Sequence, residues 1–243
     1  MIGSMNTNTY TRYGYADLLP LMERMTGDEK HDDASTSTLD ILWVLYDKVL
    51  RVFPDQPERG DRDRFLLSKG HGPTAYYAVL AAKGFFPVEW LDEFGAFESP
   101  LGHHPDRALV PGVEISSGSL GHGLPIAVGR ALALRSLGSS SRVVVLVGDA
   151  ELDEGSNHEA IAVAGRLGLD SITVVVVDNG SATHGWPGGI ARRFEVEGWV
   201  GRNVDGRSHD ELERALSAPA ESRASDGTAA PLVVVARVEQ RGA

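Results

Sequence analysis

The chain has 243 residues, 42% of them hydrophobic, and a net charge of −11 at pH 7. This length suffices for one α/β domain with a full core, and the acidic balance argues against nucleic acid as a partner, because phosphate backbones require basic patches. The absence of cysteine excludes disulfides and thiolate chemistry, and no apolar run approaches the ~20 residues that span a bilayer. We therefore expect a cytoplasmic protein that binds neither nucleic acid nor membrane.

We expect a single domain over residues 15–243, preceded by a tail over residues 1–14 that could derive in part from a tag. Apolar residues at helical spacing and the stop signals around them predict six helices, namely Tyr15–Met25, Thr38–Val52, Thr74–Lys83, Pro87–Ala96, Gly121–Leu137 and Ser208–Leu216. Residues 54–60 and 218–228 are predicted to be loops, and residues 231–238 a last buried strand.

Two β-branched runs are the most informative stretches of the chain. Residues 142–147 are followed by Gly148 and Asp149, and residues 172–177 are followed by Asp178 and Asn179. Both runs are apolar on both faces, which is typical of central strands in a parallel sheet. A helical pattern from Glu159 supplies the crossover that parallel strands require. The fold class predicted is α/β, with a mostly parallel central sheet and helices on both faces.

Asp149 and Asn179 follow two such strands, so we expect both at the carboxyl edge of the sheet, where open α/β sheets bind ligands. A carboxylate, an amide carbonyl and a nearby backbone carbonyl form a hard-oxygen set suited to Mg²⁺ or Ca²⁺. Mg²⁺ usually completes its shell with phosphate oxygens, which favours a bound diphosphate. The alternative is structural: Asp149 as a helix N-cap and Asn179 as a turn residue.

The motifs around this pair resemble the diphosphate-binding half of transketolase, a thiamine diphosphate enzyme. The resemblance extends from about Leu21 to Val238 and rests on five segments in the family's order: His31 ahead of the apolar run 39–45, Ser68-Lys69-Gly70-His71-Gly72, His104-Pro105, Gly118-Ser119-Leu120-Gly121-His122-Gly123, and Gly148-Asp149 with Asn179-Gly180-Ser181. Any one segment would be weak, whereas five in order are a specific signal.

The resemblance implies a thiamine-diphosphate-binding fold and assigns residues to the cofactor. Thiamine diphosphate would be bound by His71, Gly118, Leu120, Gly148, Asp149, Ala150, Glu154 and Asn179. Its Mg²⁺ (or Ca²⁺) would be held by Asp149, Asn179 and the carbonyl of Ser181. The alternatives are a turn-capping role for His71 and, for residues 118–123, called the glycine-rich turn below, a role in helix packing alone.

Three histidines and two acids are further implied by the resemblance. His31, His71 and His104 match family histidines that surround the reacting carbon of the cofactor and bond sugar hydroxyls, where imidazoles can move protons near neutral pH. His103 is expected at the surface. Glu154 and Glu159 match acids that lie between the two active sites of the family's dimer, with solvated helix charges as the alternative.

The sequence also departs from the family pattern. Ala150 replaces the second glycine of the cofactor motif, and would cost about 1–2 kcal/mol if that position required a positive φ. Asp32 and Asp33 follow His31 where the family has small residues. The segment after Ser181, through Trp186, is several residues shorter than usual.

The domain that protonates the cofactor's aminopyrimidine in this family has no counterpart in the sequence. The resemblance therefore implies the N-terminal subunit of a split transketolase, inactive alone, that joins a C-terminal subunit in an α2β2 heterotetramer and moves a two-carbon ketol unit from a ketose (phosphate) donor to an aldehyde. One alternative keeps the cofactor but delivers the unit to a non-sugar or carrier-bound acceptor in a specialised biosynthetic pathway. Another is a non-catalytic homologue that acts as an interaction subunit, which the retained Asp149, Asn179 and histidines argue against.

Overall fold

The computed structural model describes residues 13–26, 36–217 and 227–238. Within these residues five strands form one sheet in the spatial order β1-β2-β3-β5-β4, and every neighbouring pair is parallel. The strands are β1 (Arg64–Leu67), β2 (Val143–Gly148), β3 (Ile172–Asp178), β4 (Val200–Asp205) and β5 (Leu232–Arg237). The predicted parallel α/β class is confirmed.

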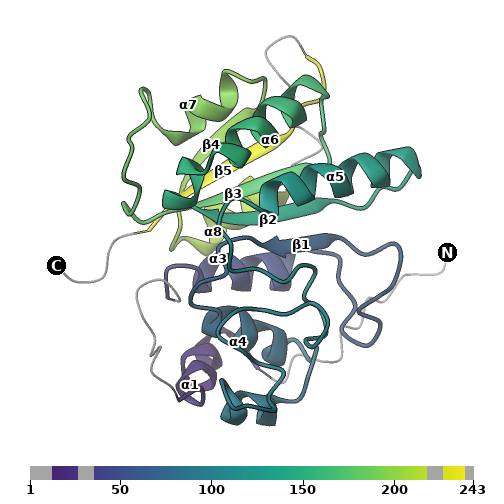
Figure 1. Cartoon of the computed structure of the whole chain (residues 1–243), viewed down its shortest axis with the longest axis vertical. Coiled ribbons are helices and arrows are strands. Elements are labelled where there is room, and N and C mark those ends of the chain that lie inside the picture. Colours follow the sequence, from purple (N-terminus) through teal and green to yellow (C-terminus); the bar gives the residue numbers. More distant parts are fainter. Residues whose placement is uncertain (1–12, 27–35, 218–226, 239–243) are drawn as a thin grey trace.

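Helices cover both faces of the sheet (Figure 1). One face packs against α5 (Gly123–Ser136), α6 (Gly155–Arg166) and α7 (Ile190–Glu195), and the other against α3 (Leu39–Val44), α4 (Thr74–Ala82) and α8 (His209–Ser217). Helix α1 (Leu18–Glu23) packs on α4, farther from the sheet. Short helical turns complete the described chain, namely η1 (Tyr15–Asp17), the π-helical η2 (Leu45–Val49), η3 (Val88–Glu93) and η4 (Ala150–Asp153). None of the helices in these ranges is long and apolar enough to cross a bilayer.

The central strands are apolar throughout because each of their faces is buried in a different core. Side chains alternate along a strand, so Val144 and Leu146 of β2 enter the core under α3 and α4, whereas Val143, Val145 and Val147 enter the core under α5 and α6. Every residue of β2 is buried. This two-sided burial holds the carboxyl ends of β2 and β3 in place.

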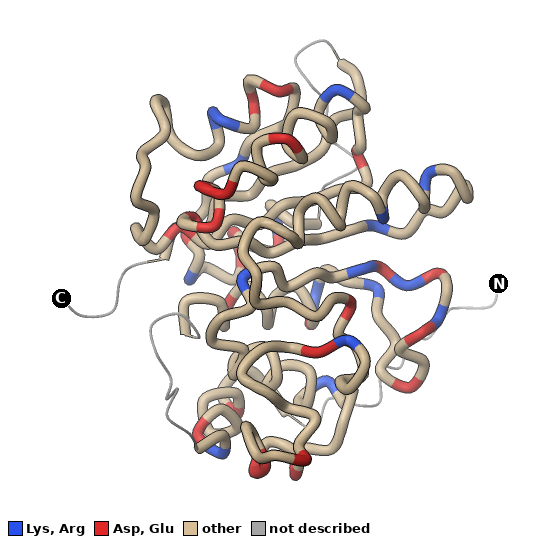
Figure 2. The backbone as a smooth tube through the Cα atoms, viewed as in Figure 1, with Lys and Arg blue, Asp and Glu red and all other residues tan. Residues whose placement is uncertain are grey.

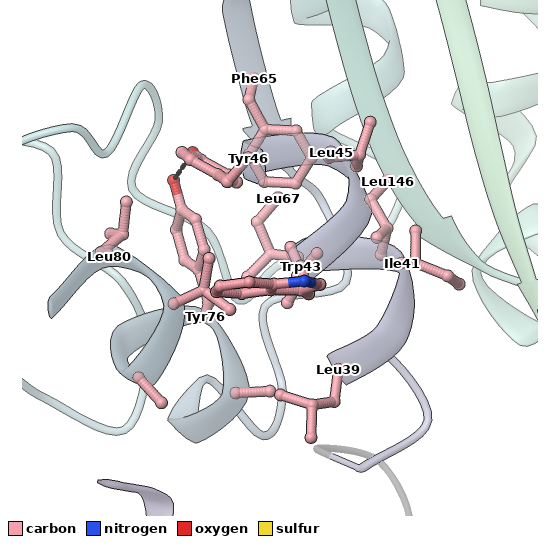
Figure 3. Close-up of a cluster of buried hydrophobic side chains, with 14 of the residues drawn as sticks. Leu39, Ile41, Trp43, Leu45, Tyr46, Phe65, Leu67, Tyr76, Leu80 and Leu146 are labelled. Atoms are coloured by element: carbon pink, nitrogen blue, oxygen red, sulfur yellow. Dashed lines mark hydrogen bonds between the residues drawn. The ribbon is translucent and has the colours of Figure 1, made fainter. Parts of the chain in front are cut away.

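Aromatic side chains pack among the aliphatic ones in the core on the α3 and α4 side (Figure 3). Tyr46, Phe65 and Tyr76 pack ring against ring with centroids 5.5–6.1 Å apart. The hydroxyls of Tyr46 and Tyr76 lie 3.1 Å apart and share a hydrogen bond, which satisfies two polar groups that burial would otherwise leave unpaired. Burial raises the pKa of the Tyr76 phenol well above its usual value.

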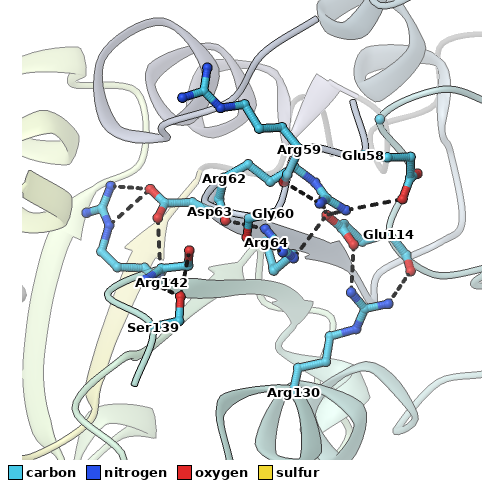
Figure 4. Close-up of polar contacts among 12 residues, drawn as sticks. Glu58, Arg59, Gly60, Arg62, Asp63, Arg64, Glu114, Arg130, Ser139 and Arg142 are labelled. Atoms are coloured by element: carbon cyan, nitrogen blue, oxygen red, sulfur yellow. Dashed lines mark hydrogen bonds and ion pairs between the residues drawn. The ribbon is translucent and has the colours of Figure 1, made fainter. Parts of the chain in front are cut away.

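Charged residues bind one another at the amino edge of the sheet, opposite the carboxyl ends of the strands (Figure 4). The buried Glu114 pairs with Arg62 at 2.9 Å and with Arg130 at 2.6 Å, and the buried Asp63 pairs with Arg142 at 2.9 Å. Figure 2 shows basic and acidic residues following one another along the segment that leads into β1. Because each buried carboxylate has a guanidinium partner, this network ties β1 to β2 and α5 without an unpaired buried charge.

Most predicted helices are present, with different boundaries. The helix predicted over Thr38–Val52 ends at Val49 through the π-helical turn, and the helix predicted over Pro87–Ala96 is the 3₁₀ turn η3. Strands β1 and β4 and helix α7 have no counterpart among the predicted elements. Both strands lie at the edges of the sheet. β4 is only half-buried and lacks an apolar run, and the buried apolar run of β1 is short, from Phe65 to Leu67, so neither carries the long apolar run of the central strands. Residues 1–12 of the predicted tail and residues 218–226 of the predicted loop lie outside the described ranges.

Candidate active site

The carboxyl ends of β2 and β3 lie side by side. Gly148 is paired with Val177 in the parallel register, and the amide of Asp149 donates to the carbonyl of Val177 at 3.0 Å. Asp149 and Asn179 are therefore neighbours at one edge of the sheet, as expected from the two strand sequences. This is the edge at which open parallel sheets bind their ligands.

Asp149 is almost completely buried, with 1% of its surface exposed. Its Oδ1 accepts hydrogen bonds from the amide of Ala150 at 2.9 Å and from the hydroxyl of Ser181 at 2.5 Å. Its Oδ2 accepts from the amides of Ser181 at 2.7 Å and Ala182 at 3.1 Å. The segment after Asn179 thus folds back over the carboxylate and brings all three residues expected to hold a metal together.

Asn179 carries an acceptor with no protein donor. Its Oδ1 is buried and has no hydrogen-bond partner among the described residues, a situation that is costly for a buried polar atom. A cation beside Asp149 would remove that cost, since amide and carboxylate oxygens are the ligands that Mg²⁺ and Ca²⁺ prefer. No cluster of three His, Asp or Glu side chains suited to a metal occurs in the described ranges, so the oxygen set at this edge is the candidate.

Two of the three predicted histidines lie together. The rings of His71 and His104 meet edge to face, with centroids 5.0 Å apart, and His104 Nδ1 lies 3.1 Å from the carbonyl of Gly70. The neighbouring His103 instead packs against the ring of Phe94, with centroids 5.4 Å apart. The two adjacent histidines therefore face different surroundings, and His104 is the one that contacts residues 68–72, called the histidine loop below.

The glycine-rich turn brings a third segment to the same place. Gly118 has φ +136°, and a Cβ built on it would lie 3.1 Å from two ring atoms of His104. Gly121 has φ +81°, and its carbonyl accepts a 2.6 Å hydrogen bond from the hydroxyl of Ser156. Leu120 between them is half-buried. A side chain at position 118 would separate the turn from His104, so glycine is required there.

The remaining predicted positions are Ala150, the two acids Glu154 and Glu159, and the segment at His31. Ala150 lies in η4, and no non-glycine residue of the described ranges has a positive φ, so the strain considered for an alanine at this position does not arise. Glu154 and Glu159 are exposed in the single chain, and the side chain of Glu154 lies directly against Gly121. His31, Asp32 and Asp33 lie outside the described residues.

The described chain resumes at Thr36 in a group of hydrogen bonds centred on Asp40. The guanidinium of Arg207 donates to the carbonyl of Thr36 and to Asp40 Oδ2, both at 2.9 Å. Asp40 Oδ1 also binds the hydroxyl of Tyr15 at 2.5 Å and His209 Nε2 at 2.9 Å. One buried carboxylate thus joins η1, the start of α3 and the turn between β4 and α8.

The shortened segment after Ser181 packs on α6 and α7. The ring of Trp186 lies 5.0 Å from that of His158, and the guanidinium of Arg193 lies 5.5 Å from the Trp186 ring centre and bonds His158 Nδ1 at 3.3 Å. The segment therefore has aromatic and cationic contacts of its own, which hold it against the helices despite its short length.

The sequence predicts no role for Glu151, Lys69 or Asn157, all of which belong to the site. Glu151 is 1% exposed, and Asn157 donates to its backbone carbonyl at 2.7 Å. Burial raises the pKa of the Glu151 carboxyl, while hydrogen bonds to it and the charge of Lys69 oppose that rise. The signal available in the sequence was a charged residue inside the cofactor motif, two positions after Asp149.

Fold and site together define an α/β domain with a candidate ligand site at the carboxyl edge of a parallel sheet. Comparison with known families gives the same class: residues 25–229 match the family described as transketolase, thiamine diphosphate binding domain. The chain belongs to the transketolase family.

Individual relatives refine this placement. The chain is 54% identical over 234 residues to a Rhodococcoides fascians protein named Ferredoxin fas2, covering 96% of this chain and 75% of that protein. It is 43% identical over 145 residues to one of the subunits of the apulose-4-phosphate transketolase of Actinobacillus succinogenes, covering 60% of this chain and 52% of that subunit. The transketolase of Leishmania mexicana has the same fold, with a TM-score of 0.77 at 23% identity, over 93% of this chain and 36% of its own.

These proteins are longer than the segments they share with this chain. The chain spans about half the length of the apulose-4-phosphate relative and about a third of the Leishmania transketolase. The part of this chain that matches the family, residues 25–229, is the thiamine diphosphate binding domain.

Proposed function

We propose that this chain is the N-terminal subunit of a thiamine-diphosphate-dependent transketolase, which transfers a two-carbon ketol unit from a ketose (phosphate) donor to an aldehyde. The observation that carries the proposal is the convergence of four separate segments at one sheet edge: His71, His104, Gly118, and the Asp149–Ser181 contact. Membership of the family supplies the cofactor, and the geometry supplies residues suited to hold it.

In this proposal Asp149, Asn179 and the carbonyl of Ser181 hold Mg²⁺ (or Ca²⁺), and the metal holds the diphosphate. The unpartnered buried Oδ1 of Asn179 supports this arrangement, as does the position of Ser181 beside the Asp149 carboxylate. When bound, thiamine diphosphate supplies a stabilised carbanion that can accept and release the two-carbon unit. The residues of this chain bind and orient it.

The histidines act on the substrate in this proposal. His104 and His31 donate hydrogen bonds to donor hydroxyls, while His71, flanked by Gly70 and Gly72, lies nearer the diphosphate. Contact between the His71 and His104 rings supports a shared site. Imidazoles suit the role because they hold or release a proton near neutral pH.

A partner subunit is part of the same proposal. The relative from Actinobacillus is named as one subunit of its transketolase, which supports a separately encoded second subunit here, and we propose an α2β2 heterotetramer. Single apolar side chains are exposed on α5 and on α6 and at its end, namely Ile126 (41%), Val163 (43%) and Leu167 (45%). Exposed apolar side chains are available for contact with a partner subunit. A cytoplasmic location completes the proposal, because a chain without cysteine has no disulfides that need an oxidising compartment.

A second candidate keeps the chemistry and changes the acceptor. This candidate is a specialised pathway with a non-sugar or carrier-bound acceptor. The chain is 54% identical to a protein not named a transketolase, against 43% for the apulose-4-phosphate relative, so the similarities do not restrict the acceptor to a sugar. The short segment over His158 and Arg193 is the part of the site that would differ toward such an acceptor.

Reconstitution tests the proposal. The purified chain, a C-terminal transketolase subunit from the same organism, Mg²⁺ and thiamine diphosphate are combined with a ketose phosphate donor and a panel of aldehydes. We expect cofactor binding and donor cleavage by the pair and no turnover by the chain alone. Cofactor binding and donor cleavage without transfer to any sugar aldehyde would favour the second candidate. Absence of cofactor binding by the pair would refute both.

A further inference from the structure

Glu151 is a buried carboxylate with three donors and almost no contact with solvent. Its Oε1 accepts hydrogen bonds from the hydroxyl of Ser68 and from the amide of Gly121, the latter at 3.0 Å. Its Oε2 accepts from the amide of Gly148 at 3.3 Å. A side chain with 1% exposure and this number of donors is held in one position.

The three donors come from three different segments of the site. Ser68 lies at the end of β1, three residues before His71, and Gly121 belongs to the glycine-rich turn. Gly148 ends β2, immediately before Asp149. Ser68 in turn accepts a 3.0 Å hydrogen bond from the amide of Gly123, the first residue of α5. One carboxylate therefore joins the histidine loop, the turn beside His104 and the strand that presents Asp149.

Close packing leaves these segments little room to shift. A Cβ at position 123 would lie 2.3 Å from the Cβ of Ser68, and a Cβ at position 148 would lie 3.4 Å from Cδ of Lys69. The spacing between the histidine loop and the start of α5 is thus set by the close approach of Gly123 to the Ser68 side chain, and the Glu151 carboxylate bonds the segments that meet there. Loss of one of its hydrogen bonds would leave a buried amide or hydroxyl without an acceptor.

We propose that Glu151 is a positioning residue, which fixes the histidine loop and the glycine-rich turn relative to Asp149 so that the site is formed before thiamine diphosphate binds. This inference rests on the cofactor binding proposed above. Glu151 itself touches neither metal nor diphosphate in this role. Its effect on the cofactor passes through Ser68, Gly121 and Gly148.

Replacing Glu151 with Gln tests the proposal. The amide has one oxygen that accepts and a nitrogen that only donates, so it cannot serve donors on both sides as the carboxylate does. In the enzyme reconstituted with its partner subunit, we expect E151Q to weaken binding of Mg²⁺–thiamine diphosphate by about 10- to 100-fold, with kcat at saturating cofactor little changed. In E151M, which has no acceptor, we expect a larger loss.

Hydrogen exchange on the full chain alone gives a readout that needs neither cofactor nor partner. Amides in the segments 118–123 and 146–151 should exchange faster in E151Q than in the wild type, at temperatures where both remain folded. S68A should have a similar effect, and the cofactor affinity of the double variant S68A/E151Q should be less than additively reduced, because both changes break the same link.

Asp63→Asn is the matched control. Asp63 is similarly buried and accepts hydrogen bonds from the amides of Arg51 at 3.0 Å and Arg142 at 2.9 Å, but it lies at the opposite edge of the sheet. It should lower the melting temperature and leave cofactor affinity unchanged. If the wild-type enzyme binds the cofactor and E151Q binds it with the same affinity, the positioning role alone is overturned. Failure of the wild-type pair to bind cofactor would overturn the proposed function and this role with it.

Discussion

The imidazole rings of His71 and His104 meet edge to face at an interplanar angle of 84°, although they belong to separate loops. His71 follows β1, and His104 lies between η3 and α5. Their contact depends on a third residue, because Gly118 allows the ring of His104 to lie against the glycine-rich turn. The shape of the site therefore depends on the absence of a side chain at position 118.

Gly118→Ala should distort the site. An alanine would be strained at φ +136°, and its Cβ would lie 3.1 Å from the His104 ring, so we expect a loss of about 1–2 kcal/mol in unfolding free energy and weaker cofactor binding. Urea unfolding and calorimetric titration would measure the two effects. Gly129→Ala on α5 is the control, since its Cβ would meet nothing within 4 Å, and it should be neutral or stabilising. Equal behaviour of the two variants would contradict the contact.

Asp149→Ala should abolish binding of thiamine diphosphate by the assembled enzyme and preserve the fold. The carboxylate is the one charged group in the proposed metal set, and metal and diphosphate bind as one unit. Titration with Mg²⁺ and cofactor measures the loss, and circular dichroism checks the fold. Asp170→Ala, at an exposed turn, should bind as the wild type does. Undiminished affinity in Asp149→Ala would exclude the metal assignment.

His104→Ala should lower kcat/KM for the donor in the reconstituted enzyme. The loss of transition-state stabilisation should be roughly 2–4 kcal/mol if the imidazole donates to developing negative charge. Cofactor affinity should barely change. His103→Ala should be nearly silent because its ring packs against Phe94, away from His71. Steady-state kinetics of the two variants shows which of the two histidines acts on the donor. A silent His104→Ala would remove this loop from the active centre.

Asp40 should make folding stability depend on pH. Burial alone raises its pKa, but hydrogen bonds from Tyr15, Arg207 and His209 outweigh this, and the pKa of the folded state lies below its usual value. The stabilisation is therefore present above the unfolded pKa of about 3.9 and is lost as pH falls through the lower folded pKa. Asp40→Asn should be less stable than wild type at pH 7, and the difference should shrink below about pH 5.

Urea unfolding at several pH values measures this effect, with Glu213→Gln on the exposed side of α8 as the control. A stability difference between wild type and Asp40→Asn that stays constant down to pH 2 would show that the ion pairs of Asp40 contribute nothing in the folded state.

The local sequence was sufficient to predict the parallel sheet and the edge of the sheet at which Asp149 and Asn179 lie. The run from Val143 to Val147 is apolar at every residue, and only a strand buried on both faces requires this. Two such strands joined by a crossover helix must end at the same edge, so the proximity of Asp149 and Asn179 followed from chain order alone. The edge strands β1 and β4 were not predicted, because the apolar run of β1 is short and β4 is only half-buried.

Tertiary structure alone decided which loop residues meet beyond that edge. The contact of His71 with His104, and the three donors gathered by Glu151, join segments far apart in the chain. Loop paths depend on close approaches such as that of Gly123 to Ser68. The pattern of apolar residues within either segment does not predict such a contact. A carboxylate inside a polar motif looks the same in sequence whether it is solvated or buried, and only the packing of α5 against the sheet placed Glu151 out of water.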